Sequence, residues 1–467
     1  MNTLDASFLE IEDQVSHMHI GSIAIFEGPA PRPEVLRRMM LGKLPLVPRY
    51  RQVVRRIPFG FGRPVWVDDA HFNLDYHLRR TSLPAPGGEL ELRQLVGRVM
   101  SQQLDRARPL WETWAIEGLP DRRWALLSKT HHCMVDGVSA SDLLTVMLDR
   151  QRRPPPTTVE PWRPSAAPAG VELFGGALLS GAEAVYAAGR SLLDPGPIAA
   201  RGRDAAGGLL RMRDVVYPTP SSSLNGAVGQ SRRWGLARAQ LSDIKTVRRA
   251  LGGTVNDVVL ACVTGGFRRL LLARGESVQR VVRTLVPVSV RSPGERGEYN
   301  NRVSAMFAEL PVEMRDPALA LDAIRVQMED LKRSKEAVAG EVLTSLGGFA
   351  PPMLLALAER VGTRVPQHNV NTVTTNVPGP QHPLYAAGRR MLEAFGYVPL
   401  GGHMRLGVAI FSYDGALTFG VTGDYDSTPD IDVLCKGIEQ ALSELLALCA
   451  PDARAVIRAR EPAELRG

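Results

Sequence analysis

The residues of this chain with the clearest capacity for chemistry form one short run, HHCMVDG, at residues 131–137. The unperturbed pKa of histidine is about 6.5, so a neutral imidazole can take a proton from a hydroxyl or amine as that group attacks a carbonyl. We therefore interpret His132 as a candidate general base for acyl transfer. His131 would lie on the other face of a strand, where it packs or hydrogen-bonds structurally.

The flanking patterns predict the elements that must position this run. Trp124–Thr130 is apolar with partial alternation and predicts a strand, and Val138–Leu148 predicts a helix with one buried face. Asp136 and Gly137 then form the turn between them. Asp136 either orients His132 directly or supports the shape of the site through local hydrogen bonds or an ion pair, which is the commoner role of Asp before Gly.

The same run is open to two other interpretations, a metal site and a thiol nucleophile. Adjacent histidines on a strand point to opposite faces, and no Cys/His cluster with zinc spacing occurs elsewhere in the sequence, so we expect no metal. Cys133 is the weaker candidate for catalysis, because neighbours along a strand diverge and an unpaired Cys is usually a small buried hydrophobe.

The run resembles the HHxxxDG motif of the acyl-CoA-dependent acyltransferase superfamily. That superfamily includes chloramphenicol acetyltransferases, nonribosomal peptide condensation domains and the bacterial wax ester synthase/diacylglycerol acyltransferases. Further segments resemble the last of these families, in its order and across almost the whole chain: Leu4–Glu10, Met18–Gly21, Pro109–Trp111, Asn256–Ala261, Val286–Arg291 and Thr375–Pro380.

This resemblance implies an α/β fold of two chloramphenicol-acetyltransferase-like domains, each a mixed sheet with flanking helices, and an active channel at their interface. It implies direct acyl transfer from acyl-CoA to diacylglycerol or a fatty alcohol, without a covalent acyl-enzyme. His132 would be the general base, Asp136 would hold the shape of the site, and Gly137 would permit the turn. Asn256 would lie near the channel, where an oxyanion or substrate contact is expected.

Other residues in these segments are open to a structural interpretation as well as a functional one. Thr254–Asp257 has the spacing of a capping box before an apolar helix, so we interpret Asp257 as a cap rather than a catalytic acid. Asn256 is open to either role. Asn376 belongs first to a turn and second to a channel lining. Arg291 is a candidate partner for Asp136, or the exposed end of a strand.

The length and composition predict several domains. A chain of 467 residues with 44% hydrophobic content can build two or three cores. Proline-rich sequence and then a weak helical pattern predict a partly helical crossover linker at 151–222. We expect an acyltransferase domain with the histidine motif at 1–150 and a similar domain at 223–467, in which Asp414-Gly415 marks a hairpin.

Charge and hydropathy restrict the partners. The net charge is +7, which suits the phosphates of acyl-CoA or an anionic membrane surface, whereas no recognition motif supports binding to nucleic acid. No signal peptide or spanning segment of about 18 apolar residues is evident. We expect a cytoplasmic protein, peripheral on the inner membrane face or on lipid inclusions, with Val171–Arg190 as a membrane contact or an interdomain helix. Acyl-CoA is the expected co-substrate, no cofactor is expected, and the oligomeric state stays open.

Two other functions stay open at this point. One is a non-catalytic lipid-binding or carrier-docking module with the same fold, which the intact histidine motif disfavours. The other is condensation-type transfer from a carrier-bound acyl group, which the further family segments disfavour.

Overall fold

The computed structural model describes residues 1, 3–57, 63–134, 140–155, 161–168, 222–289, 303–333 and 370–449. Asp136, Gly137 and Arg291 lie outside these ranges, as do the stretch 171–190 and most of the predicted linker at 151–222. Both histidines of the motif lie inside them, together with Asn256, Asp257 and Asn376 of the second half.

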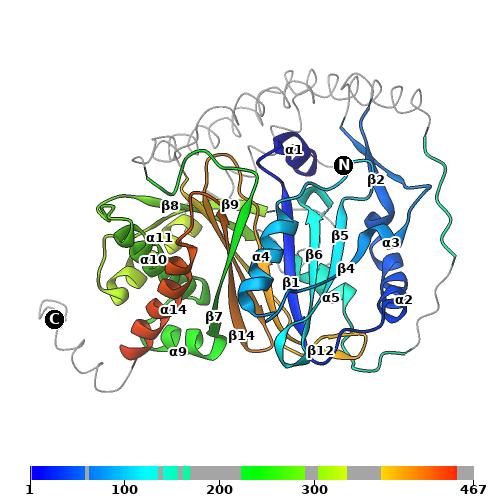
Figure 1. Ribbon diagram of the computed structural model, residues 1–467. Helices are drawn as coiled ribbons and strands as arrows, with labels where there is room; N and C mark the ends of the chain where they lie inside the picture. The colour runs from blue at the N-terminus through cyan, green and yellow to red at the C-terminus, as the bar shows by residue number, and fades with distance from the viewer. Residues whose placement is uncertain are drawn as a thin grey trace, which may run out of the picture.

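One mixed sheet carries the histidine motif (Figure 1). Its strand order is β11-β12-β1-β6-β5-β4, in which β4 and β5 are parallel and the other neighbours antiparallel. The strands are β1 (His19–Phe26), β4 (Leu78–Ser82), β5 (Trp111–Glu117), β6 (Trp124–His131), β11 (Tyr385–Ala386) and β12 (Arg389–Tyr397). Two strands from late in the chain therefore complete the sheet of the first half.

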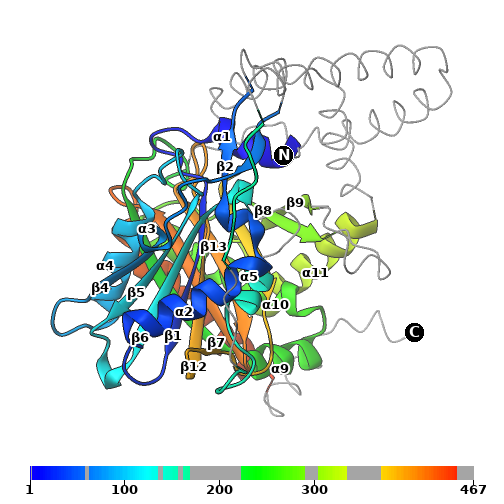
Figure 2. The same cartoon turned by 90° about the vertical axis from the view of Figure 1, so that its right-hand side faces the viewer.

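Helices cover both faces of this sheet (Figure 2). Successive side chains along a strand point to opposite sides, so apolar side chains on both faces are buried against helices. On one face, Ile23 and Leu127 pack against α4; on the other, Ala24 and Leu126 belong to a core with residues of α2 and α5. The described α-helices of this half are α1 (Thr3–Ile11), α2 (Pro33–Lys43), α3 (Leu74–His77), α4 (Glu89–Met100) and α5 (Ala140–Met147). Apart from the main sheet, β2 (Gln52–Arg55) pairs antiparallel with β3 (Val65–Asp68).

A second mixed sheet has the strand order β7-β14-β13-β10-β8-β9. β10 is parallel to β13 and β8, and the other neighbours are antiparallel. Its strands are β7 (Arg232–Gln240), β8 (Val282–Ser289), β9 (Val303–Leu310), β10 (Thr372–Pro378), β13 (Leu406–Tyr413) and β14 (Ala416–Asp424). Four helices share its largest apolar core: α9 (Leu241–Leu251), α10 (Val255–Ala273), α11 (Pro317–Arg333) and α14 (Ile431–Ala447). The α/β class and the paired mixed sheets predicted from the sequence are confirmed.

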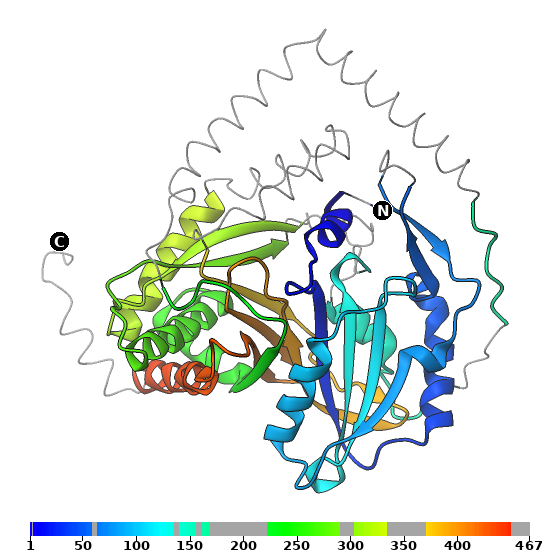
Figure 3. The same ribbon diagram turned by 45° about the horizontal axis from the view of Figure 1, so that its top comes forward.

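The two sheets meet where β12 crosses β13 and β14 (Figure 3). A Cβ atom at Gly420 would lie 1.9 Å from the backbone oxygen of Gly396, so only glycine permits this close approach. The hydroxyl of Thr418 donates to the carbonyl of Ala394 at 2.6 Å and joins the sheets at the same place. The site strand β6 is therefore held in a sheet that the second half helps to build and to support.

Local signals in the sequence account for several element boundaries. Thr254 and Asp257 form the predicted capping box at the start of α10. Asp414 and Gly415 both have positive φ, 44° and 85°, as a tight turn between antiparallel strands requires, and they join β13 to β14 as predicted. None of the described helices is by itself long and apolar enough to cross a membrane; α9 and α10 meet that length and composition test only as a pair bent by 101°.

Candidate active site

The two histidines of the motif have different surroundings, as the alternation along β6 predicts. Lys129 and His131 point toward the α4 face, where the Lys129 ammonium donates to the carbonyl of Val99 at 2.9 Å. Ser128 and Thr130 point to the opposite face and line a pocket there. His131 is the last residue of β6, and His132 begins a 3₁₀ turn, η5 (His132–Met134).

His132 is held on its backbone and on its ring. Its N–H donates to the carbonyl of Met18 at 2.8 Å, and its imidazole stacks on Phe8 with ring centroids 3.9 Å apart. Burial is the main cause that lowers the pKa of His132 to about 4. The imidazole is therefore neutral at pH 7, which is the form that a general base needs.

One ring nitrogen of His132 is closed off from solvent and from partners in the described part of the protein. Nδ1 is buried and has no hydrogen-bond partner among the described residues, whereas the residue as a whole keeps partial exposure. Because Asp136 lies outside the described residues, its predicted support of this ring is not part of the observed geometry.

His131 is a buried structural residue, in contact with a carboxylate that the sequence reasoning did not single out. Its Nδ1 accepts a hydrogen bond from the Cys133 N–H at 3.1 Å, and its Nε2 lies 3.5 Å from Oε2 of Glu12. Oε1 of Glu12 lies 3.3 Å from Nε2 of His19, which is paired with His131 across β1 and β6. The first histidine of the motif thus belongs to a buried polar cluster behind β6.

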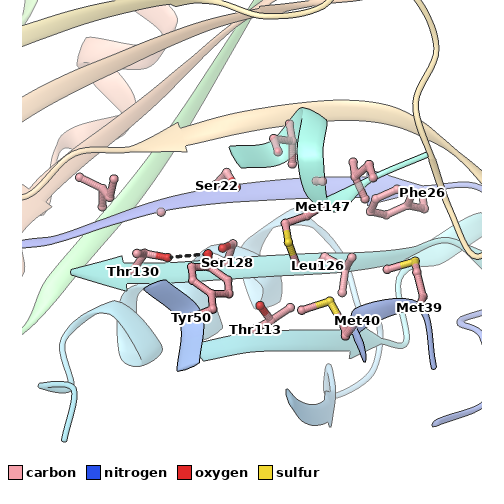
Figure 4. Close-up of a pocket in the computed structure, with 15 residues that line it drawn as sticks. Ser22, Phe26, Met39, Met40, Tyr50, Thr113, Leu126, Ser128, Thr130 and Met147 are labelled. Atoms are coloured by element: carbon pink, nitrogen blue, oxygen red, sulfur yellow. Dashed lines mark hydrogen bonds between the residues drawn. The ribbon is translucent and has the colours of Figure 1, made fainter. Parts of the chain in front are cut away.

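An apolar pocket lies on the His132 face of β6, beneath α2 and α5 (Figure 4). It encloses a cavity of about 60 Å³. Met39, Met40 and Met147 project into it from the helices, and their flexible thioethers can adapt to an occupant. Hydroxyl groups lie along its sheet side, at Ser22, Tyr50, Thr113, Ser128 and Thr130. The residues that line this pocket all belong to the first half, and the channel that the family resemblance implies between the two halves stays a prediction.

Asn256 and Asn376 come together from distant parts of the chain. The Asn376 side-chain N–H donates to Oδ1 of Asn256 at 3.1 Å, which joins the first turn of α10 to β10. β10 also packs against α5, the helix that follows the histidine motif. Neither amide has a hydrogen bond to His132 among the described residues. Asp257 is 2% exposed, and its carboxylate accepts the Thr254 N–H at 2.8 Å, as a helix cap.

Trp111 and Cys133 have structural roles beside the site. The Trp111 indole N–H donates to the Tyr50 carbonyl at 2.9 Å, and its ring stacks between Tyr50 and His77. Cys133 is fully buried, and burial raises the pKa of its thiol, so the nucleophilic thiolate is disfavoured. Within the described ranges, no group of three His, Cys, Asp or Glu side chains is arranged to hold a metal ion.

Comparison with known families agrees with the geometry. Residues 1–259 match the wax ester synthase/diacylglycerol acyltransferase catalytic domain, and residues 299–446 match the WS/DGAT C-terminal domain. The chain belongs to the wax ester synthase/diacylglycerol acyltransferase (WS/DGAT) family. The resemblance inferred from HHCMVDG and the accompanying segments is confirmed.

Similar proteins match almost the whole length of this WS/DGAT chain. A putative diacylglycerol O-acyltransferase of Mycobacterium bovis and a probable one of Mycobacterium tuberculosis are each 37% identical over 456 residues, 96% of this chain and 96% of each relative. The solved wax ester synthase/diacylglycerol acyltransferase from Marinobacter aquaeolei VT8 is 26% identical, with a TM-score of 0.67, and covers 96% of this chain and 99% of that one. The protein is an acyltransferase of this family and acts in lipid biosynthesis.

A more distant likeness concerns the fold alone. The first condensation domain of the calcium-dependent antibiotic synthetase is 18% identical, with a TM-score of 0.60, and the match covers 97% of this chain and 96% of that one.

Several residues around the histidines of this WS/DGAT acyltransferase were missed by the sequence reasoning. Phe8 and Met18 lie in segments that carry the family resemblance, but nothing in those segments indicates that they touch His132. Glu12 gave a weak signal, as one of three acidic residues, with Glu10 and Asp13, shortly before His17 and His19. Tyr50 gave none, because its contact with Thr130 joins segments far apart in the chain.

Proposed function

We propose that this acyltransferase moves a long-chain acyl group from acyl-CoA directly onto the hydroxyl of diacylglycerol or of a fatty alcohol, with His132 as general base. The observation that carries the proposal is a neutral imidazole at the end of β6, next to the face of that strand that lines an apolar pocket. The products are a triacylglycerol or a wax ester, together with free CoA.

In the proposed reaction the acyl group moves directly from CoA to the acceptor, and no covalent acyl-enzyme forms. Nε2 of His132 takes the hydroxyl proton as the acceptor oxygen attacks the thioester carbonyl and forms a tetrahedral oxyanion. The oxyanion collapses, the C–S bond breaks, and the imidazolium returns its proton to the departing CoA thiolate. Acyl-CoA brings the activated carbonyl, so the scheme uses it as co-substrate and needs no metal or bound cofactor.

The pocket supports the choice of an acyl substrate. Apolar groups and methionine side chains line most of it, and burial of each methylene contributes about 0.8 kcal/mol. The acyl chain would extend from the reacting carbonyl near His132 past Thr130 and Ser128 toward the methionines of α2 and α5. Movement of those flexible side chains would enlarge the cavity for a long chain.

The test is CoA release from a panel of acyl-CoA donors and acceptors, followed by identification of the lipid product. His132→Ala should lower turnover by about 100-fold or more, because general-base catalysis contributes factors of that size. His71→Ala is the control, since His71 is exposed. Normal turnover by folded H132A protein would reject the base, and saturable binding without CoA release would favour a lipid-binding module. Transfer only from a phosphopantetheine-loaded carrier would favour condensation chemistry.

We extend the proposal to location: the protein works in the cytoplasm, at the inner membrane face or on lipid inclusions. The support is the oily nature of both proposed substrates and the net charge of +7. Co-sedimentation should be stronger with vesicles that contain anionic lipid than with zwitterionic vesicles, and should weaken as salt rises. Equal binding to both kinds of vesicle would contradict the electrostatic part of this proposal.

A further inference from the structure

Glu12 is a buried carboxylate beside the site for which the proposed reaction has no use. It follows directly after α1, and its side chain is only 3% exposed. Burial by itself raises its pKa, but interactions with His131, His19 and Arg106 outweigh burial and hold the pKa of Glu12 far below its usual range. The carboxylate is therefore ionised, and a buried charge is tolerated only where its partners are well placed.

One side of Glu12 faces the histidine motif. Nδ1 of His131 accepts the Cys133 N–H, so that nitrogen carries the lone pair and the proton of the neutral ring sits on Nε2. Nε2 faces Oε2 of Glu12 at 3.5 Å. The negative carboxylate favours this tautomer, and the tautomer in turn secures the 3₁₀ turn in which His132 precedes Cys133.

The other side of Glu12 holds α1. Arg106 donates to Oε2 through Nε at 3.1 Å and through Nη2 at 2.6 Å, and the same Nη2 donates to the carbonyl of Leu9 in α1 at 3.1 Å. Phe8 precedes Leu9 and stacks on His132. The carboxylate of Glu12 is thus linked to His132 in two ways: through His131 to the turn that contains His132, and through Arg106 to the helix that carries Phe8.

We propose that Glu12 is a positioning residue for His132. Its charge fixes the Nε2-protonated tautomer of His131, which orders the turn at Cys133, and its bond to Arg106 anchors α1 so that Phe8 lies on the imidazole. This inference rests on the proposed role of His132 as the base.

The test removes the charge of Glu12 and keeps the shape of its side chain. Glu12→Gln should lower kcat by on the order of tenfold to a hundredfold and leave KM for acyl-CoA little changed, because misplacement of a catalytic group slows the chemical step more than binding. In ¹⁵N-histidine spectra, assigned by the signal lost in His131→Gln, E12Q should shift His131 away from the Nε2-protonated tautomer. A purely structural role would leave that signal in place.

Glu112→Gln is the matched control. Glu112 is also buried, at 9% exposure, and is paired with Arg79 at 3.1 Å, but it lies on β5. E112Q should lower the unfolding midpoint as much as E12Q does while keeping wild-type kcat and the His131 tautomer. Equal kcat losses in E12Q and E112Q, wild-type kcat in E12Q, or an unchanged tautomer in E12Q would each overturn the proposal.

A second variant covers the case in which E12Q does not fold. Arg106 is 43% exposed, so Arg106→Gln removes the bonds to Oε2 from the solvent side, and it should lower kcat several-fold with KM little changed. Unchanged kcat in R106Q would then overturn the proposal. The H132A measurement separates the two hypotheses: full activity there rejects the base itself, whereas an inactive H132A beside a fully active E12Q rejects only the role of Glu12.

Discussion

The imidazole of His132 stacks on the phenyl ring of Phe8, with ring centroids 3.9 Å apart and 27° between the ring planes. Phe8 belongs to α1, which packs against the turn η5 that His132 begins. The phenyl ring removes water from one side of the imidazole and so favours its neutral form. It also restricts rotation of the imidazole, and a base must hold its nitrogen toward the acceptor hydroxyl.

Removal of the phenyl ring should slow the reaction without weakening binding. We predict that Phe8→Leu, which keeps apolar bulk, lowers kcat by on the order of tenfold because the base is less well oriented. CoA release under saturating substrate measures the effect. Phe72→Leu is the control, since Phe72 stacks on a different histidine, His77, with centroids 5.4 Å apart. Similar losses in both variants would show that the stack on His132 has no special role.

The pH dependence of turnover should report the neutral base. Because the pKa of His132 is lowered to about 4, chiefly by burial, we predict that kcat is independent of pH above about 5 and falls toward lower pH. Turnover from pH 8 down to pH 4.5, checked by circular dichroism for retained fold, gives the profile. An inflection near the unperturbed value of about 6.5 would show instead that the ring is solvated.

The buried histidines should make folding sensitive to acid. Burial is the largest cause that lowers the pKa of His19 to about 3 and of His132 to about 4. Below about pH 6.5 the unfolded chain binds protons that the folded chain does not bind, so the free energy of unfolding falls as pH drops. The stability that comes from keeping these two histidines neutral is fully present above pH ~6.5, and it is lost progressively as the pH falls to their folded-state pKa values.

Urea unfolding at several pH values between 7.5 and 5 measures how steeply the free energy of unfolding falls with pH. His19→Gln removes one titrating group and should make that fall less steep. A midpoint in urea that is the same at pH 7.5 and at pH 5 would contradict the prediction.

A larger side chain in the pocket should shorten the preferred acyl chain. Ser128 lines the pocket from β6, and we predict that Ser128→Leu shifts the ratio of kcat/KM for long over short acyl-CoA by about tenfold or more, since one methylene changes discrimination by factors of about 10 to 200. Competition between palmitoyl-CoA and octanoyl-CoA measures the ratio. Ser443→Leu, the same change at an exposed position of α14, should leave it unchanged. An unaltered ratio in S128L would place the acyl chain elsewhere.

The sequence alone determined the features that depend on neighbours along the chain. Alternation through Trp124–Thr130 predicted a strand that sends His131 and His132 to different surroundings. Thr254 and Asp257 predicted the start of α10, and Asp414-Gly415 predicted the β13–β14 turn. Each is decided by backbone geometry over a few residues, where spacing and the preference for positive φ are sufficient. The histidine motif predicted the family for the same reason, because its chemistry is concentrated in seven residues.

The tertiary structure decided which of these local pieces meet. β12 hydrogen bonds to β1 although most of the chain separates them, and Asn376 bonds to Asn256 across a similar gap. Glu12 meets His131 and Phe8 meets His132 only because α1 folds back over the end of β6. Pairing at such separations depends on the burial of apolar faces across the whole molecule and on matching buried charges with partners. A local pattern contains neither, so the supports of His132 became visible only in the folded protein.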